Sequence, residues 1–175
     1  EFLFSDERVT IEDHILEHAM LIACTDGSNS VVELLLNHNP TLMDYLLGVW
    51  VAGKDERNSA LYMASHYNNV ETVKVLLKHG ALANKGRCPV TDSSVSSEVL
   101  ELLLASDQFT EENIGDALLI ACNRGNEATA EVLLKKIQNV GYKNLNGTTA
   151  LHEAVSSGST SLVKKLLTEY KANPN

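Results

Sequence analysis

The chain has 175 residues, of which 44% are hydrophobic and 21% charged, so it is long enough and apolar enough to fold around a core. It carries 23 acidic and 14 basic residues, and the formal charge of −9 opposes non-specific attraction to nucleic acid or anionic lipid. Its three widely spaced cysteines, Cys24, Cys88 and Cys122, and the lack of a visible secretory signal or bilayer-length apolar stretch predict an intracellular, cytoplasmic protein without a disulfide framework, a cofactor or direct membrane insertion.

The first helix expected along the chain begins near Thr10 and carries the sequence His14-Ile15-Leu16-Glu17-His18. This pattern matches the H-x-x-E-H motif of one class of zinc peptidases, in which two histidines one helical turn apart bind a metal. Three fixed letters arise often by chance, and His18 falls where a repeat described below would start its helix. We therefore expect neither a catalytic nor a metal site, and a metal-dependent hydrolase using His14, Glu17 and His18 is the least favoured alternative.

Two segments far apart in the chain are nearly identical. Residues 19–24 read AMLIAC and residues 117–122 read ALLIAC, and each precedes a glycine turn and a leucine-rich helix. Residues 59–64 (SALYMA) and 149–154 (TALHEA) repeat the pattern. One alanine and an apolar residue three positions earlier share a helical face in every copy, so we expect both to be buried. The pairs are Met20 with Ala23, Leu61 with Ala64, Leu118 with Ala121, and Leu151 with Ala154.

The copies are unequal in length. An insertion that contains Trp50 is expected within residues 40–58, after the first copy. The third copy is expected to have a shortened first helix near residues 88–92, because Pro89 suits a first helical turn but not a helix interior. Thr110 is the expected N-cap of the fourth copy. When the copies are aligned on the turn between their two helices, the equivalent positions are Gly27, Asn68, Ser94, Gly125 and Gly158.

The stretch NGTTALHEAVSSGSTSLVKKLL, residues 146–167, resembles an ankyrin repeat, and Cys24 and Cys122 lie close to three periods of roughly 33 residues apart. The resemblance implies an all-α solenoid of about five stacked helix-turn-helix repeats in one domain, with His152 bracing neighbouring repeats by hydrogen bonds. Residues 173–175 resemble the opening of another repeat, so we expect a piece of a longer protein. The approximate repeats are 14–39, 56–85, 86–107, 113–145 and 146–175.

The resemblance implies a monomeric protein-interaction module whose partner is another protein, bound along the concave side. The alternative is a regulatory or targeting segment of a larger enzyme, channel or pathogen effector. Residues just before the repeated alanine, and those before the turn, are the expected contacts: Ile22, Met63, Ile120, Glu153, Tyr62, His66, Tyr67, Asn123 and Arg124.

Some candidate contacts have a plainer interpretation. The insertion or the preceding helix would then cover the apolar stripe formed by Ile22, Met63 and Ile120. Arg57, also a candidate contact, would belong to a solvated charged loop. Trp50 is either an anchor for the partner or a staple that holds the insertion on the stack.

Overall fold

The predicted all-α repeat architecture is confirmed in the computed structural model of the chain. The chain divides into two compact units, residues 1–89 and 90–175. The expected cap at Thr10 lies outside the part of the chain that the structure describes. The described residues are 13–44, 46–47, 50–51, 54–55, 58–83 and 86–173.

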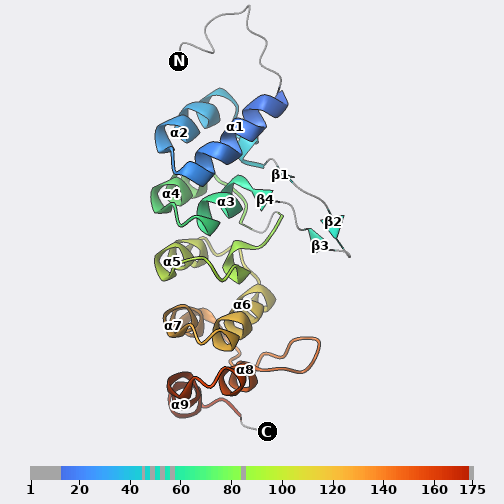
Figure 1. The fold of residues 1–175 in the computed structure, drawn as a ribbon, viewed down its shortest axis with the longest axis vertical. Coiled ribbons are helices and arrows are strands. Elements are labelled where there is room, and N and C mark those ends of the chain that lie inside the picture. Colours follow the sequence, from blue (N-terminus) through green and yellow to red (C-terminus); the bar gives the residue numbers. More distant parts are fainter. Residues whose placement is uncertain are drawn as a thin grey trace, which may run out of the picture. The chain divides into compact units, whose positions relative to one another are not determined.

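The first unit contains two helix pairs. Helix α1 (Asp13–Asp26) is followed by α2 (Asn29–His38), and α3 (Ala60–His66) is followed by α4 (Val70–Lys78). In each pair the earlier member is the first helix of a repeat and the later member is the second helix. The first helices α1 and α3 pack on each other, and so do the second helices α2 and α4, which gives the unit two helical layers (Figure 1).

The insertion between these pairs forms a short 3₁₀ helix and small antiparallel strand pairs. The 3₁₀ helix η1 spans Pro40–Asp44. Strand β2 (Trp50–Val51) pairs with β3 (Lys54–Asp55), so the insertion folds back on itself. The predicted location of the insertion is therefore confirmed. A second antiparallel pair joins β1 (Leu46–Leu47) to β4 (Asn58–Ser59) and delivers the chain to α3.

The second unit also has two helical layers. Helices α5 (Ser97–Ala105), α7 (Glu127–Lys136) and α9 (Thr160–Thr168) are second helices, and α6 (Glu111–Asn123) and α8 (Ala150–Ser156) are first helices. Helix α6 packs on both α7 and α8, α5 packs on α7, and α8 packs on α9 (Figure 1). Each helix thereby buries an apolar face that no single repeat could cover alone.

The first helix of the third repeat is shortened, as predicted. A single 3₁₀ turn, η2 (Pro89–Thr91), stands in its place, and the proline begins it. After this turn the Asp92 carboxylate accepts hydrogen bonds from the backbone amide of Ser94 at 2.9 Å and from its hydroxyl at 2.8 Å. Such a local side-chain bond favours a turn over a helix.

The alanine positions predicted from the repeat pattern lie in the core. Ala23, Ala64, Ala121 and Ala154 are all buried. The apolar residues three positions earlier are buried with them, from 0% exposure at Met20 to 9% at Leu151. A methyl side chain at the first position lets neighbouring first helices approach closely, and the larger side chain fills the space between them.

The turns between first and second helices share one hydrogen-bond geometry. Gly27, Asn68, Gly125 and Gly158 have φ values between 57° and 72°, which is the left-handed conformation that glycine and asparagine adopt most readily. The next backbone N–H then donates to the carbonyl of the repeated alanine, as from Asn126 to Ala121 at 2.9 Å. This is the Schellman motif, and it stops each first helix at the same place in its repeat.

Candidate partner-binding surface

The residue before each buried alanine was expected to face away from the core. Ile22, on α1, is 62% exposed, and Met63, on α3, is half-buried. In the second unit Ile120 and Glu153 are half-buried at the same position of α6 and α8. One step along a helix turns a side chain by roughly 100°, so burial of the alanine rotates its predecessor toward the rim of the packed face.

An aromatic patch surrounds the end of α3. The His66 ring stacks on Tyr62 with centroids 5.8 Å apart, and meets Tyr67 edge-on at 5.0 Å. The guanidinium carbon of Arg87 lies 4.8 Å from the centroid of the Tyr62 ring. Tyr67 is 51% exposed, and Arg87 is exposed as well. We call His66, Tyr67 and Arg87 the aromatic patch, since they present rings and a cation at one surface.

The prediction that Tyr62 contacts a partner directly is wrong. Its side chain is only 4% exposed, because the ring lies beneath His66 and Arg87. Tyr62 therefore supports the aromatic patch from below. Arg87 was missed in the sequence because it follows α4 in a loop, and only the tertiary contact with the ring reveals its place.

In the second unit the predicted residues gather near the C-terminal end of α6. The Asn123 side-chain amide donates to the Glu153 carboxylate at 2.6 Å, which links α6 to α8. Ile120 and the exposed Arg124 line a shallow crevice of about 10 Å³ together with Thr91. Such a crevice is too small for a ligand, so these residues offer a surface for contact, not a pocket.

Two predicted contacts cannot be placed. Trp50 belongs to β2, but its side chain lies outside the described part of the structure, and so does the whole of Arg57. The choice between anchor and staple for Trp50 therefore stays a prediction.

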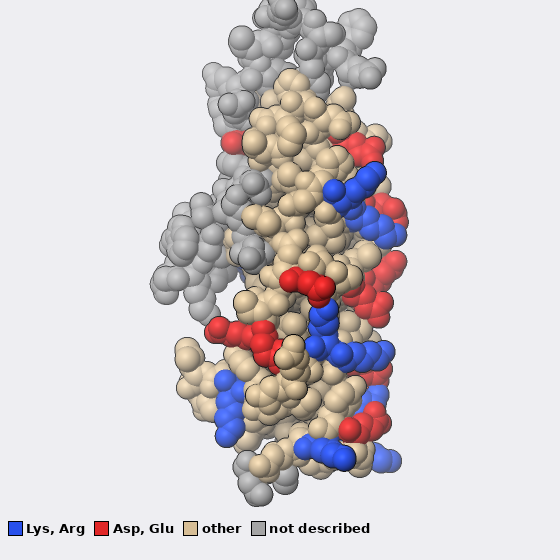
Figure 2. Space-filling view, turned by 180° about the vertical axis from the view of Figure 1, so that it is seen from behind, with Lys and Arg blue, Asp and Glu red and all other residues tan. Residues whose placement is uncertain are grey.

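Charged side chains gather over the second helices within each unit (Figure 2). Helix α4 carries Glu71, Lys74 and Lys78, and the Lys74 ammonium lies 2.6 Å from the Glu71 carboxylate. Helix α3, in contrast, contains no Asp, Glu, Lys or Arg. Within this repeat the two helices therefore present different chemistry, with apolar and aromatic groups on the first helix α3 and an ion pair on the second helix α4.

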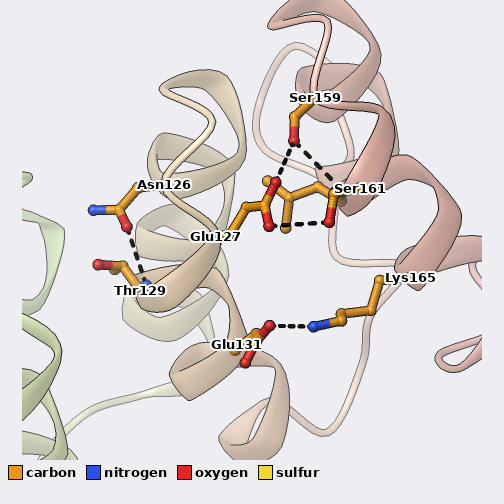
Figure 3. A network of polar contacts seen from close by, with 8 residues as sticks. Asn126, Glu127, Thr129, Glu131, Ser159, Ser161 and Lys165 are labelled. Carbon is orange, nitrogen blue, oxygen red and sulfur yellow. Dashed lines mark hydrogen bonds and ion pairs between the residues drawn. The ribbon is translucent and has the colours of Figure 1, made fainter.

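Many polar groups of the second helices of the last two repeats bond to one another (Figure 3). The Glu127 carboxylate, on α7, accepts hydrogen bonds from the hydroxyls of Ser159 at 3.4 Å and of Ser161 at 3.0 Å, at the start of α9. Lys165 and Glu131 form an ion pair one turn further on. The hydrogen bond from Lys165 lowers the pKa of Glu131, and the same bond raises the pKa of Lys165. These groups join neighbouring repeats, which leaves them less available to a partner.

Comparison with known proteins decides the family. A profile of three consecutive ankyrin repeats matches residues 2–86, 20–114 and 93–175. The chain belongs to the ankyrin repeat family.

Similar proteins carry ankyrin repeats in very different settings. The ankyrin chain is 32% identical over 133 residues to a putative ankyrin repeat protein of fowlpox virus, covering 69% of this chain and 39% of the viral protein. It is 29% identical over 123 residues to the human transient receptor potential cation channel subfamily A member 1, covering 65% of this chain and 11% of the channel. It is 32% identical over 130 residues to the ankyrin repeat and KH domain-containing protein mask-1 of Caenorhabditis elegans, covering 68% and 5%. The chain thus spans well under half the length of each relative.

The histidine implied to brace ankyrin repeats forms hydrogen bonds within its own repeat. The Nδ1 atom of His152 lies 2.7 Å from the Thr149 hydroxyl and 3.3 Å from its backbone amide nitrogen. Together with the bond from the His152 amide to the Thr149 hydroxyl, this forms a capping box at the start of α8. These bonds stabilise the helix of its own repeat, and bracing between repeats stays a prediction.

The H-x-x-E-H pattern lies on α1 of the ankyrin chain. Glu17 is half-buried and His18 is exposed, and the side chain of His14 is not described. Among the described side chains, no group of three or more His, Cys, Asp or Glu residues is arranged to hold a metal ion. The described helices also include none that is both long enough and apolar enough to cross a bilayer.

The cysteines of the first helices are chemically protected. Burial raises the pKa of the Cys24 thiol to about 12, and burial together with the charge of Glu153 does the same for Cys122. Cys88 is half-buried beside η2. The thiolate is the form that reacts with alkylating agents, and a pKa of about 12 leaves on the order of 0.01% of a thiol ionised at pH 8.

We expect iodoacetamide at pH 8 to modify Cys88 at least about a hundredfold faster than Cys24 or Cys122. Peptide mass spectrometry over a time course measures the three rates. A Cys88→Ser variant should lose the fast reaction, and denaturation in urea should equalise the remaining two cysteines. Fast native labelling of Cys122 would contradict the burial of that thiol.

Proposed function

We propose that this ankyrin repeat chain is a protein-interaction module that binds a protein partner through its first helices. Ankyrin repeats generally serve in protein interaction. The exposed apolar and aromatic groups indicate which residues would contact the partner. Ile22 and Tyr67 are more than half exposed, and aromatic residues and arginine often dominate interface energies. The second helices α7 and α9 are a weaker candidate because Glu127, Glu131 and Lys165 bond between repeats.

The proposal covers the class of partner and the setting. A net charge of −9 disfavours nucleic acid as the partner and supports a protein. We propose a monomer that acts in the cytoplasm without catalysing a reaction. Light scattering of the purified chain tests its monomeric state.

The first-helix surface is tested by affinity capture with matched variants. We expect Ile22→Ser and Tyr67→Ala each to weaken capture of a specific partner by about tenfold or more, since exposed anchors of this kind contribute 1 to 4 kcal/mol at interfaces. Val31→Ser is the control, because Val31 is 45% exposed but lies on the second helix α2. Quantitative mass spectrometry of captured proteins compares the variants. Equal loss with the Val31 control, or no loss with either test variant, contradicts the proposed surface.

A second candidate function is that of a regulatory or targeting segment within a longer protein. Support comes from the human cation channel, of which a similar region makes up only 11%. The sequence of the full-length transcript tests this idea directly. A catalytic or membrane domain in the same open reading frame would favour it, and an open reading frame of ankyrin repeats alone would argue against it.

A further inference from the structure

Helix α6 departs from the other first helix of its unit at its N-terminal end. Ala121 and Ala154 occupy the same place before their turns, yet α6 begins more than one turn earlier than α8 relative to that alanine. Thr110 starts this extension through a capping box with Asn113, as the sequence predicted for Thr110. A loop that could have formed a finger before α6 is therefore reduced to residues 106–110.

The shortened connection borders a cavity at the start of α6. Its volume is about 280 Å³, close to the lower limit of small-ligand pockets and large enough for one bulky side chain. Leu104 and Ile114 are buried apolar residues in its wall, and half-buried Phe109 completes that wall. An apolar side chain that entered here would exchange water for these three hydrophobic contacts.

The rim of the cavity is polar, and contacts within the protein hold its charged groups. Glu111 accepts hydrogen bonds from the backbone amides of Gln138 at 3.0 Å and Asn139 at 2.8 Å, which holds its carboxylate in place. Lys136 also lines the cavity, and its ammonium lies 2.5 Å from the Asp107 carboxylate. The polar groups around the opening are thus positioned by contacts with one another before any ligand arrives.

Further carboxylates make this end of α6 acidic. Glu112 and Asp116 lie on the same two turns as Glu111. Their influence is visible at Tyr142, whose pKa is raised to about 12 by burial, by its hydrogen bond to Asp116, and by the charges of Asp116 and Glu112. The charge of Lys136 is paired with Asp107, so the remaining carboxylates at this end of α6 would attract positive groups on a ligand.

We propose that this cavity binds one large apolar side chain of a protein partner, at a position flanked by lysine or arginine in the partner's sequence. The apolar wall receives the side chain, and the acidic N-terminal end of α6, where Glu112 is exposed, favours the flanking cations. The site is distinct from the surface of the proposed function, because it lies at the opposite end of α6 from Ile120 and Arg124.

The test titrates the ¹⁵N-labelled chain with the peptide acetyl-Gly-Ser-Lys-Leu-Lys-Ser-Gly-amide and follows backbone amides by NMR. The expected shifts fall on residues 104–116 and 136–139. Replacing the peptide leucine with alanine should weaken binding by about tenfold. Replacing its lysines with glutamates should weaken it by about two- to fivefold for each charge.

Variants of the protein test the same site from the other side. Gln138 is exposed on the rim, so Gln138→Trp should occlude the cavity without disturbing the core and weaken peptide binding by about tenfold, while Gln138→Ala keeps it. Circular dichroism confirms that both variants stay folded. Ile22→Ser and Tyr67→Ala should leave peptide binding unchanged, which separates this site from the proposed function. Shifts centred on Ile120 and Arg124, equal binding of the glutamate peptide, undiminished binding by Gln138→Trp, or no shifts at about 5 mM peptide would each overturn the proposal.

Discussion

Replacing Leu118 with alanine is expected to lower the free energy of unfolding by about 2 to 5 kcal/mol. Leu118 lies on α6 and is 1% exposed, and α6 packs on both α7 and α8. Truncation removes three buried carbon atoms and leaves a cavity between helices that cannot close fully. Urea denaturation followed by circular dichroism measures the loss.

Leu151 provides the matched control because it occupies the same repeat position on α8. It is 9% exposed, so the same substitution removes less buried surface. We expect Leu151→Ala to cost about 1 kcal/mol less than Leu118→Ala. An equal or greater cost at Leu151 would show that the two positions are not ordered by burial, against the packing described here.

Replacing Gly115 with alanine is expected to destabilise the protein by about 1 to 3 kcal/mol, although alanine normally favours a helix. A Cβ atom at Gly115 would lie 2.4 Å from the Cδ1 atom of Tyr142, which real structures do not tolerate. Tyr142 would have to move, and its hydroxyl would lose the 2.8 Å hydrogen bond that it donates to Asp116. Thermal unfolding of the purified variant provides the measurement.

A double-mutant cycle identifies Tyr142 as the cause. With Tyr142→Ala already present, the steric conflict is absent and the better helix propensity of alanine remains, so Gly115→Ala should become neutral or stabilising by up to about 1 kcal/mol. Tyr142→Phe alone should cost about 1 kcal/mol through the lost hydrogen bond. The interpretation is wrong if Gly115→Ala has the same effect with and without the tyrosine ring.

The helix pairs could be predicted from the sequence because their determinants are local and repeated. Apolar residues at helical spacing, a buried alanine, and glycine or asparagine at the turn recur together, and each constrains a short stretch of chain. The insertion near Trp50 and the shortened third repeat were predicted for the same reason, because an interruption of a repeated pattern can be seen in the amino-acid sequence. The position of Ile22 at the rim of the packed face follows from the burial of Ala23.

Tertiary packing decided the details on which binding depends. Tyrosine is a residue type that is common at interfaces, but the ring of Tyr62 is covered by His66 and by Arg87, which lies in a loop. The cavity beside α6 likewise exists only where α5, the extension of α6 and the end of α7 meet. Helical periodicity predicts the direction in which a side chain points from the axis of its helix. Whether it reaches water depends on neighbours distant in sequence, and their approach is determined by the fit of side chains between helices.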